Sequence, residues 1–464
     1  MTRFTDKFTS FYKRLLPSPF SIAILLTLLT FILALIFTRP TGEGIGSYSV
    51  DLLKSWEEGL WKTGGGGLYF AFQMMLMLVL GHILAISSPA SKVIDALTLP
   101  CKDTASSAFV VTIATIAVSL FNWGLGLIFG AILARKIGEK FNRENKPLNY
   151  ALIGAAAYSG LMVWHGGLSG SAPIKAADEN NLHDLVAKMD VDLASVPTRI
   201  DMGETVFSTM NIVVSLVLII VLPLLMRAIG KKEKPHQKLP SPVMVEEEVI
   251  EKHKGAEKLD HSRIFSLTIG IVILFYAFHK AVIQPEKLSL SFLTPNFINF
   301  VLLGLGLMLH LSITKYVKAA NDAISGATGI LLQFPLYFGI LGIMIGSGLI
   351  IDISDWFVSI STKETFSIFT FFSAGLVNVF VPSGGGQWVV QGPVIISAAQ
   401  ELGVSYPKAI MALSYGDQLT NMIQPFWALP LLGITGLKAR DILPYTLILF
   451  LAGIVIFLSG LIIF

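Results

Sequence analysis

Charged residues are scarce in this sequence. Asp, Glu, Lys and Arg make up 14% of its 464 residues, whereas 53% of them are hydrophobic. So few charges exclude an ordinary water-soluble chain, in which about a quarter of the residues are charged. The mean hydropathy of +0.69 instead indicates a membrane protein, with a lipid bilayer as its main partner.

Cysteine occurs once, at Cys101, which excludes an internal disulfide. No group of Cys and His has the spacing of metal ligands, so a structural zinc is not expected. No metal or other cofactor is predicted. A nucleic acid partner is not expected either, because the basic residues are dispersed and form no compact patch. An enzyme is also not expected, since no nucleophile lies near a base.

Long apolar runs are what the sequence has in abundance. A membrane helix needs about 20 apolar residues, and about nine such spans are expected, at 20–38, 68–86, 148–165, 207–226, 264–279, 297–311, 326–350, 410–432 and 443–463. Two more apolar segments, 105–135 and 365–400, are interrupted by Gly, Asn or Pro and suit re-entrant helical hairpins. The sequence therefore predicts an all-α membrane protein.

The distribution of basic residues predicts the orientation of these spans. With the N-terminus in the cytoplasm, most Lys and Arg fall in inside loops, while the outside loop 173–205 is acidic. The C-terminus then lies outside. The polar segment 229–262, rich in Lys, Glu and Pro, is interpreted as a cytoplasmic linker between two halves, 1–228 and 263–464.

The two halves resemble each other weakly, in an ordered way. Laid over the first half, the second half matches Asn378 to Asn122, Tyr415 to Tyr158 and Pro430 to Pro173. Each half contains a span, a hairpin, an interrupted span and a closing span, running in opposite directions. This arrangement predicts an inverted repeat, which is common among secondary transporters and places the site between the repeats.

Small and polar residues at the two hairpins are the first candidates for substrate binding. Glycine amides at a turn and the N-terminus of a helix can stabilise a carboxylate. The glycines could equally serve close packing between helices. These candidates are Asn122, Trp123, Gly124, Asn378, Ser383, Gly384, Gly385, Gly386 and Gln387.

The remaining candidates lie in two spans that are interrupted, the span from 148 at the segment 164–173 and the span from 410 at the segment 415–430. Ser169 and Ser171, with Asn421 and Gln424, are expected to contact the substrate. Asp417 is the one carboxylate placed inside a span, which indicates a functional role. The predicted ion-coupling set is Asp417, Gln418, Thr420 and His165.

A bare Asp417 carboxylate would repel an anionic substrate, and binding of H⁺ or Na⁺ would remove this conflict. Coupled symport is therefore expected, and the coupling cation stays open between the two. Two structural alternatives also stay open. Asp417 could cap a half-helix, and His165 could be a hydrogen-bonded structural residue.

The scarcity of basic residues in the hairpins and interrupted spans limits the charge of the substrate. Apart from Arg135 at a cytoplasmic end, they contain no Lys or Arg, so one carboxylate is accommodated more easily than two. Aromatic side chains could enclose a small apolar tail; they are Trp123, Trp164, Trp388, Phe426 and Trp427. A small monocarboxylate fits this description, and a dicarboxylate or other small carboxylate is the alternative.

Six segments carry a family resemblance: LPSPFSIAILLTLLTF, NWGLGLIFGA, GGLSGSAP, GILLQFPLYFGI, VPSGGGQWVVQGP and YGDQLTNMIQPFWALP. Through them the chain resembles the bacterial short-chain fatty acid transporter family over nearly its whole length. The resemblance implies uptake of acids such as butyrate or acetoacetate at the bacterial plasma membrane. It also implies membership in a superfamily of ion transporters, elevator-type carboxylate carriers that form homodimers. Two positions depart from the family pattern: His165 stands where a small residue is usual, and Asp417 where Glu is usual.

Overall fold

The computed structural model describes residues 18–61, 67–187, 193–232, 255, 257–284, 292 and 294–464. Every regular element in these ranges is a helix, which confirms the predicted all-α class for this part of the chain. The basic N-terminal segment 1–17 and most of the predicted linker 229–262 lie outside the described residues.

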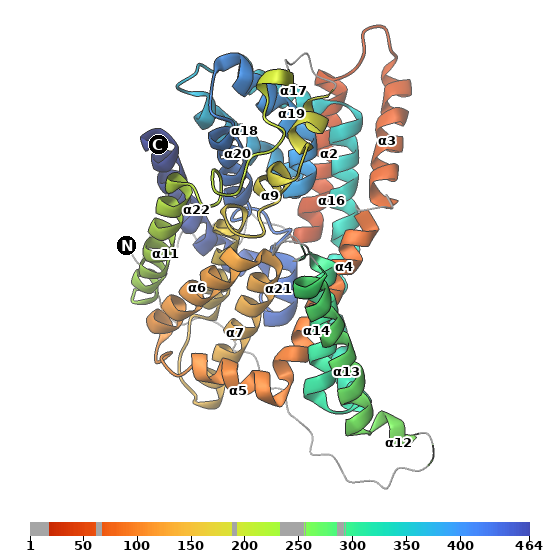
Figure 1. Cartoon of the computed structure of the whole chain (residues 1–464), viewed down its shortest axis with the longest axis vertical. Helices are drawn as coiled ribbons and strands as arrows, with labels where there is room; N and C mark the ends of the chain where they lie inside the picture. The colour runs from red at the N-terminus through yellow and green to blue at the C-terminus, as the bar shows by residue number, and fades with distance from the viewer. Residues whose placement is uncertain are drawn as a thin grey trace.

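The helices form two groups (Figure 1). In the first group, α2 and α3 pack against α16, and α4 and α13 pack against α14. Its members are α2 (Pro19–Phe37), α3 (Ile45–Trp61), α4 (Gly67–Ile86), α12 (Glu257–Asp260), α13 (Arg263–Phe278), η4 (His279–Ile283), α14 (Pro295–His310), α15 (Ile313–Ile324), η5 (Ser325–Ala327) and α16 (Thr328–Gly346). Helix α5 (Ser88–Leu97) connects this group to the second.

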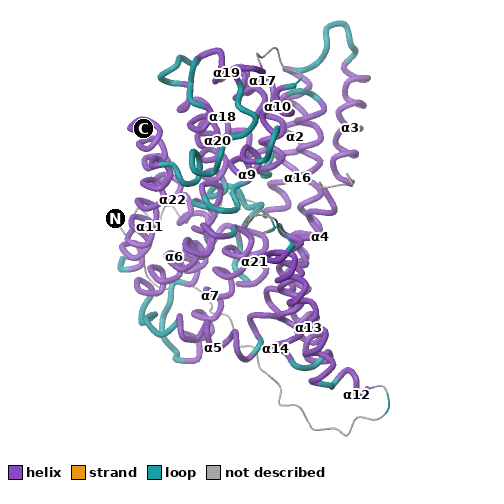
Figure 2. Tube along the Cα trace, in the orientation of Figure 1, coloured by secondary structure: helices purple, strands orange, loops and turns teal. Residues whose placement is uncertain are grey.

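The second group contains the helices on which the predicted site residues lie. Its members are α6 (Thr104–Phe121), α7 (Trp123–Arg143), α8 (Tyr150–Tyr158), η1 (Ser159–Met162), η2 (Trp164–Gly166), α9 (Ser171–Ala177), α10 (Asn181–Val186), η3 (Leu193–Ser195), α11 (Thr209–Gly230), α17 (Leu349–Ser359), α18 (Phe366–Phe380), α19 (Gly384–Leu402), α20 (Tyr406–Thr420), α21 (Ala428–Thr435) and α22 (Ala439–Ile463). Figure 2 shows loop backbone passing through the interior of this group, near α9 and α20. Each predicted sequence half contributes helices to both groups, and the division into halves stays a prediction.

Six helices in the described residues are long and apolar enough to cross a membrane: 19–37, 104–121, 209–230, 263–283, 313–346 and 439–463. Five of them coincide with expected spans, and the sixth, α6, is the first limb of the expected first hairpin. The expected spans at 68–86 and 297–311 correspond to shorter apolar helices. The span at 410–432 is interrupted after α20, within the predicted segment 415–430. The span at 148–165 is interrupted already after α8, at Tyr158, before the predicted segment 164–173. The count of nine is not confirmed.

Helix α3 was not anticipated from the sequence, because its polar residues hide its apolar face. It lies against α16 through small residues, and a Cβ added to Gly342 would clash with the Ser55 carbonyl oxygen. A Cβ on Gly59 would likewise clash with the carbonyl oxygen of Phe338. Glycine at these positions lets the two helix backbones approach closely.

Helices α6 and α7 pack against each other with only Asn122 between them, so they form a helical hairpin. Its first limb begins at a capping box. The Asp103 carboxylate accepts from the Ser106 backbone N–H at 2.7 Å, and the Ser106 hydroxyl oxygen accepts from the Asp103 N–H at 3.0 Å. These bonds satisfy N–H groups that the first turn of a helix leaves free.

The Asp103 cap predicts a pH-dependent contribution to stability. Hydrogen bonds from Ser106 hold the pKa of this carboxyl below its ordinary value of 3.8. The stabilisation is therefore present above pH 3.8 and is lost as the pH falls through the lower value of the folded state. We expect Asp103→Ala to cost about 1 kcal/mol at neutral pH. Thermal unfolding in detergent should show the two proteins converging under acid, while Asp103→Asn, which keeps the cap, stays close to wild type at neutral pH.

Candidate functional site

The two interrupted spans meet inside the second helix group. Beyond α8 the chain continues as the short helices η1 and η2, and η2 packs against α20. The backbone N–H of His165 donates to Gln418 Oε1 at 2.9 Å. The Tyr158 hydroxyl donates to the Asn421 carbonyl at 3.0 Å. Side chains near each break therefore satisfy backbone groups that the opposite break leaves free.

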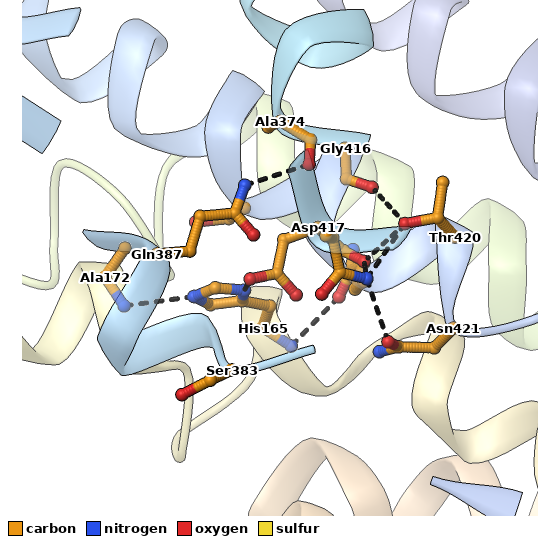
Figure 3. Close-up of polar contacts among 12 residues, drawn as sticks. His165, Ala172, Ala374, Ser383, Gln387, Gly416, Asp417, Thr420 and Asn421 are labelled. Carbon is orange, nitrogen blue, oxygen red and sulfur yellow. Dashed lines mark hydrogen bonds and ion pairs between the residues drawn. The ribbon is translucent and has the colours of Figure 1, made fainter. Parts of the chain in front are cut away.

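Asp417 is the centre of this meeting point. Its side chain is 1% exposed, and its Oδ2 lies 3.5 Å from His165 Nδ1 (Figure 3). Neither of these two atoms has a hydrogen-bond partner. No Lys or Arg side chain is buried among the described residues, so His165 is the only basic side chain found beside this carboxylate. The structure thus brings His165 and Asp417 together, as the sequence predicts.

His165 is fully buried and held on three sides. Its ring stacks on Trp164 with the ring centroids 4.4 Å apart. Its Nε2 accepts the backbone N–H of Ala172 at 3.0 Å. Its own backbone N–H is bound by Gln418 as described above, and the same Gln418 oxygen also faces the N–H of Gly166 at 3.4 Å. Gln418 therefore closes the break after α8 through its side-chain oxygen.

An amide network continues from Asp417 along α18 and α20. Asn378 is fully buried, and its Nδ2 faces three oxygens: the Asp417 carbonyl at 2.8 Å, Thr420 Oγ1 at 2.9 Å and Asn421 Oδ1 at 3.0 Å. Gln424 Nε2 donates to the Asn378 carbonyl at 3.0 Å. The four predicted polar residues Asn378, Thr420, Asn421 and Gln424 are thus brought together.

The tip of the second hairpin reaches the same place. A Cβ added to Gly384 would lie 2.8 Å from Trp164, 3.0 Å from His165 and 3.1 Å from Asp417 Oδ2. A Cβ on Gly385 would meet only Ser171 Oγ, at 3.9 Å. The first glycine of the triplet is therefore the one that the site requires, because only there does the backbone touch the His165 and Asp417 side chains.

Two other predicted residues of the second hairpin, Ser383 and Gln387, form hydrogen bonds within the hairpin. Ser383 Oγ accepts the Gly386 N–H at 3.2 Å and caps α19. Gln387 was expected to present donors to a carboxylate, but its Nε2 donates to the Ala374 carbonyl and to Gln391 Oε1, both at 2.9 Å. What Gln387 leaves unpartnered is its acceptor, Oε1.

The tip of the first hairpin is bound to the interrupted span that follows it. Asn122 Oδ1 accepts the Leu125 N–H at 3.0 Å and caps α7. The Trp123 N–H donates to Ser169 Oγ at 3.0 Å. A Cβ on Gly124 would lie 2.7 Å from the Met77 sulfur, which places this glycine against α4. Asn122 and Ser169 thus have structural hydrogen bonds, and Gly124 serves helix packing.

A row of aromatic rings joins this tip to the buried polar cluster. Ring centroids are separated by 6.0 Å for Trp164 and Trp123, 4.8 Å for Trp123 and Trp427, 4.9 Å for Trp427 and Phe426, and 4.8 Å for Phe426 and Tyr337. The polar atoms Trp164 Nε1 and Tyr337 Oη are buried without a hydrogen-bond partner. Trp388 was expected in this wall but lies apart, where its indole N–H donates to Asn181 at 3.2 Å.

Asn211 is a residue of the site that sequence reasoning missed. Its Nδ2 donates to the Gly166 carbonyl at 2.8 Å, and its Oδ1 accepts the Tyr415 hydroxyl at 3.0 Å. It therefore holds the break after η2 against α20. The available signal was an isolated amide near the start of an apolar span, 209–230.

The whole chain, residues 1–464, matches the family described as Short chain fatty acid transporter. The chain belongs to this family. In the described residues, no group of three or more His, Cys, Asp and Glu could hold a metal ion. Together with the six apolar helices, membership makes this short-chain fatty acid transporter family protein a multi-pass membrane protein.

Two relatives span nearly the same length as this family member. A protein of Escherichia coli (strain K12) is 37% identical over 470 residues, covering 100% of this chain and 99% of the relative. A protein of Haemophilus influenzae (strain ATCC 51907 / DSM 11121 / KW20 / Rd) is 37% identical over 463 residues, covering 98% of each. Both are provisionally named short-chain fatty acid transporters.

Two solved structures are more distant. The Alcanivorax borkumensis YdaH transporter is 14% identical with a TM-score of 0.43, over 96% of this chain and 97% of its own. Neisseria gonorrhoeae MtrF, described with a class of antimetabolite efflux pumps, is 15% identical with a TM-score of 0.41, over 98% of this chain and 97% of its own. At such scores the likeness contributes nothing to the assignment of a site or substrate.

Proposed function

We propose that this family member is a secondary active transporter, not an enzyme, that takes up short-chain fatty acids such as butyrate or acetoacetate by cation-coupled symport. The observation that carries the proposal is the buried Asp417 carboxylate, 3.5 Å from His165 where two interrupted helices meet. A buried ionisable group in a membrane protein is costly unless function requires it. Binding of H⁺ or Na⁺ there neutralises the site when an anionic substrate arrives.

The preference for a monocarboxylate rests on charge. No Lys or Arg side chain is buried in the described residues, so a second carboxylate would lack a fixed counter-charge. The donors left unpartnered in the cluster, Trp164 Nε1 and Asn421 Nδ2, are neutral and suit a single carboxylate. The aromatic row from Trp164 to Tyr337 supplies apolar surface for a short tail. A dicarboxylate or other small carboxylate is the alternative on the same scaffold.

The proposal includes a topology. About nine spans and two re-entrant hairpins form an inverted repeat in the bacterial plasma membrane, with the N-terminus in the cytoplasm and the C-terminus outside. Support comes from the same order of elements in both halves, with α6 and α7 followed by the break after α8, and α18 and α19 followed by the break after α20. The halves 1–228 and 263–464 and a homodimeric assembly belong to this proposal too.

Uptake into proteoliposomes tests the proposed substrate. We expect saturable uptake of labelled butyrate under an imposed H⁺ or Na⁺ gradient, at rates about tenfold or more above those of succinate. Liposomes without protein measure the butyric acid that crosses the lipid unaided. Accumulation of succinate without protein-dependent uptake of butyrate would reject the monocarboxylate and favour the alternative. Failure to transport either acid under either gradient would reject coupled carboxylate transport.

A further inference from the structure

We propose that the coupling ion is a proton carried by Asp417, and that His165 is a neutral residue that turns its Nδ1–H toward this carboxyl group and does not carry the coupling proton. The inference rests on the proposed symport and names its cation. It follows from three features of the buried cluster: the hydrogen bond at His165 Nε2, the lack of a counter-charge at Asp417, and the hydrogen bonds that already engage four oxygens near it.

The first feature settles which nitrogen of His165 bears hydrogen. Nε2 lies 3.0 Å from the backbone nitrogen of Ala172, whose N–H can only donate (Figure 3). Nε2 must therefore present its lone pair, and the ring hydrogen is on Nδ1. An imidazolium would turn two N–H groups toward each other and leave the buried Ala172 amide without a partner. This geometry holds His165 in the neutral form.

The second feature is that Asp417 has no counter-charge. The elements packed against α20 are α9, α18, α19, α22, η1 and η2. Neither α18 nor η1 carries a titratable residue, and η2 carries only His165. The remaining titratable residues of α20 and its neighbours are Lys175, Glu401, Tyr406, Lys408, Tyr415, Arg440, Asp441 and Tyr445.

None of these groups can neutralise Asp417. Lys175, Glu401 and Arg440 are exposed, and Lys408 is partly exposed at the start of α20. The buried hydroxyls are committed elsewhere, since Tyr415 donates to Asn211 and Tyr445 accepts from Asn149 Nδ2 at 2.8 Å. An ionised Asp417 would thus face only the neutral His165 N–H, 3.5 Å away and beyond the length of a charge-assisted hydrogen bond, about 2.7–2.9 Å.

The third feature concerns the oxygens available to a metal cation. A hard cation needs several oxygen ligands, whereas a proton needs one. Four oxygens near Asp417 already face hydrogen-bond donors: Gln418 Oε1 binds the His165 N–H, and the Asp417 carbonyl, Thr420 Oγ1 and Asn421 Oδ1 face Asn378 Nδ2. The amide oxygens of Asn378, Gln387 and Gln424 are unpartnered, but each belongs to a neutral side chain. The unpartnered oxygen of Asp417 is Oδ2. A single carboxylate oxygen that faces an N–H donor suits a proton.

The proton couples to substrate through charge. Protonation of Asp417 removes a negative charge from the cluster, and a substrate carboxylate can then bind without repulsion. By linkage, the bound substrate favours protonated Asp417 to the same extent. Binding of one carboxylate should therefore take up as much as one proton at a pH where Asp417 of the free protein is ionised, and none at a pH where it is already protonated.

Isothermal titration calorimetry of the purified full chain measures this proton directly. Butyrate binding is recorded at a series of pH values, each in buffers of different ionisation enthalpy, with Na⁺ or with choline as the cation. We expect proton uptake by the wild type to rise with pH toward one per butyrate, independent of Na⁺, and Na⁺-independent binding without proton uptake at every pH would overturn the inference. Asp417→Asn, which mimics the protonated acid, should bind butyrate with no proton uptake, and Asp417→Glu should restore it.

His165→Asn is the matched variant, because its amide can still donate near the position of Nδ1. It should keep the uptake of one proton. Size-exclusion profiles and thermal midpoints establish that each variant is folded. Proton uptake that persists in Asp417→Asn would place the proton on the substrate, and uptake lost only in His165→Asn would place it on the histidine; both overturn the inference.

The titrations with Na⁺ and with choline distinguish the proton inference from the proposed cation-coupled transport. Binding that requires Na⁺ and takes up no proton would contradict the proton inference while leaving cation-coupled transport intact. In that case the unpartnered amide oxygens of Asn378, Gln387 and Gln424 become the candidate ligands. Absence of butyrate binding by the folded wild type in every condition would contradict the proposed function as well.

Discussion

Gly384→Ala is expected to lower butyrate uptake by about tenfold or more, while Gly385→Ala leaves uptake close to wild type. The added methyl group at Gly384 would lie 2.8 Å from Trp164, 3.0 Å from His165 and 3.1 Å from Asp417 Oδ2. All three side chains are buried, so none can move into solvent. Overpacking of this kind costs about 1–3 kcal/mol, and here the displaced atoms are those proposed to bind the proton.

Gly385→Ala is a closely matched control for Gly384→Ala. Gly385 lies one residue along in the first turn of α19, and its added Cβ meets only Ser171 Oγ at 3.9 Å. Both substitutions replace a helical glycine by the better helix former, a change that favours the helix by about 1 kcal/mol. Uptake into proteoliposomes and butyrate binding are measured for both. Equal activity of the two variants would show that the hairpin tip does not need to touch His165 and Asp417.

Asn378→Asp is expected to abolish butyrate binding and to destabilise the protein by about 3 kcal/mol or more. The substitution keeps the shape of the side chain and removes its donors. Three oxygens that now face Asn378 Nδ2, on Asp417, Thr420 and Asn421, would lose this donor and face a carboxylate. Each buried polar group left unsatisfied costs about 1–3 kcal/mol, and the added negative charge lies beside the proposed proton site.

Asn299→Asp is the matched control for a buried amide exchanged for an acid. Asn299 is 6% exposed, and its Nδ2 donates to one carbonyl, that of Gln73, at 2.9 Å in the other helix group. This variant should lose stability yet still bind butyrate. Thermal unfolding and calorimetric binding separate the two effects. Asn378→Asp that binds butyrate as wild type does would remove the amide network from the functional site.

Residue types in the interrupted spans predicted much of the candidate site. Asp417 and His165 are separated by more than half the chain. Each was predicted to be functional because an ionisable residue inside a membrane span, or a polar residue beside a helix break, is costly in lipid. The structure brings them within 3.5 Å of each other. Asn378, Thr420, Asn421 and Gln424 also converge as expected, because amides beside a helix break must find partners inside the protein.

The sequence could not predict whether an individual polar side chain faces the substrate or a neighbouring part of the protein. Gln387, Ser383 and Asn122 were expected to face a substrate, and each has hydrogen bonds to nearby backbone or to a neighbouring glutamine. A polar residue at a break has two uses, to cap the broken helix or to bind a ligand, and the same residue types serve both. Only the tertiary structure distinguishes these uses.

The sequence by itself determined the membrane class, the all-helical fold and the family, because each depends on composition, on the length of apolar runs or on long ordered matches. It also indicated which spans are interrupted, since Gly and Pro disrupt a helix wherever the helix lies, although α8 ends at Tyr158, before the predicted segment 164–173. The tertiary structure decided which of three glycines touches the site, which nitrogen of His165 carries hydrogen, and that Asn211 holds the break. These depend on contacts between residues remote in the chain, and no local pattern encodes the identity of a distant neighbour.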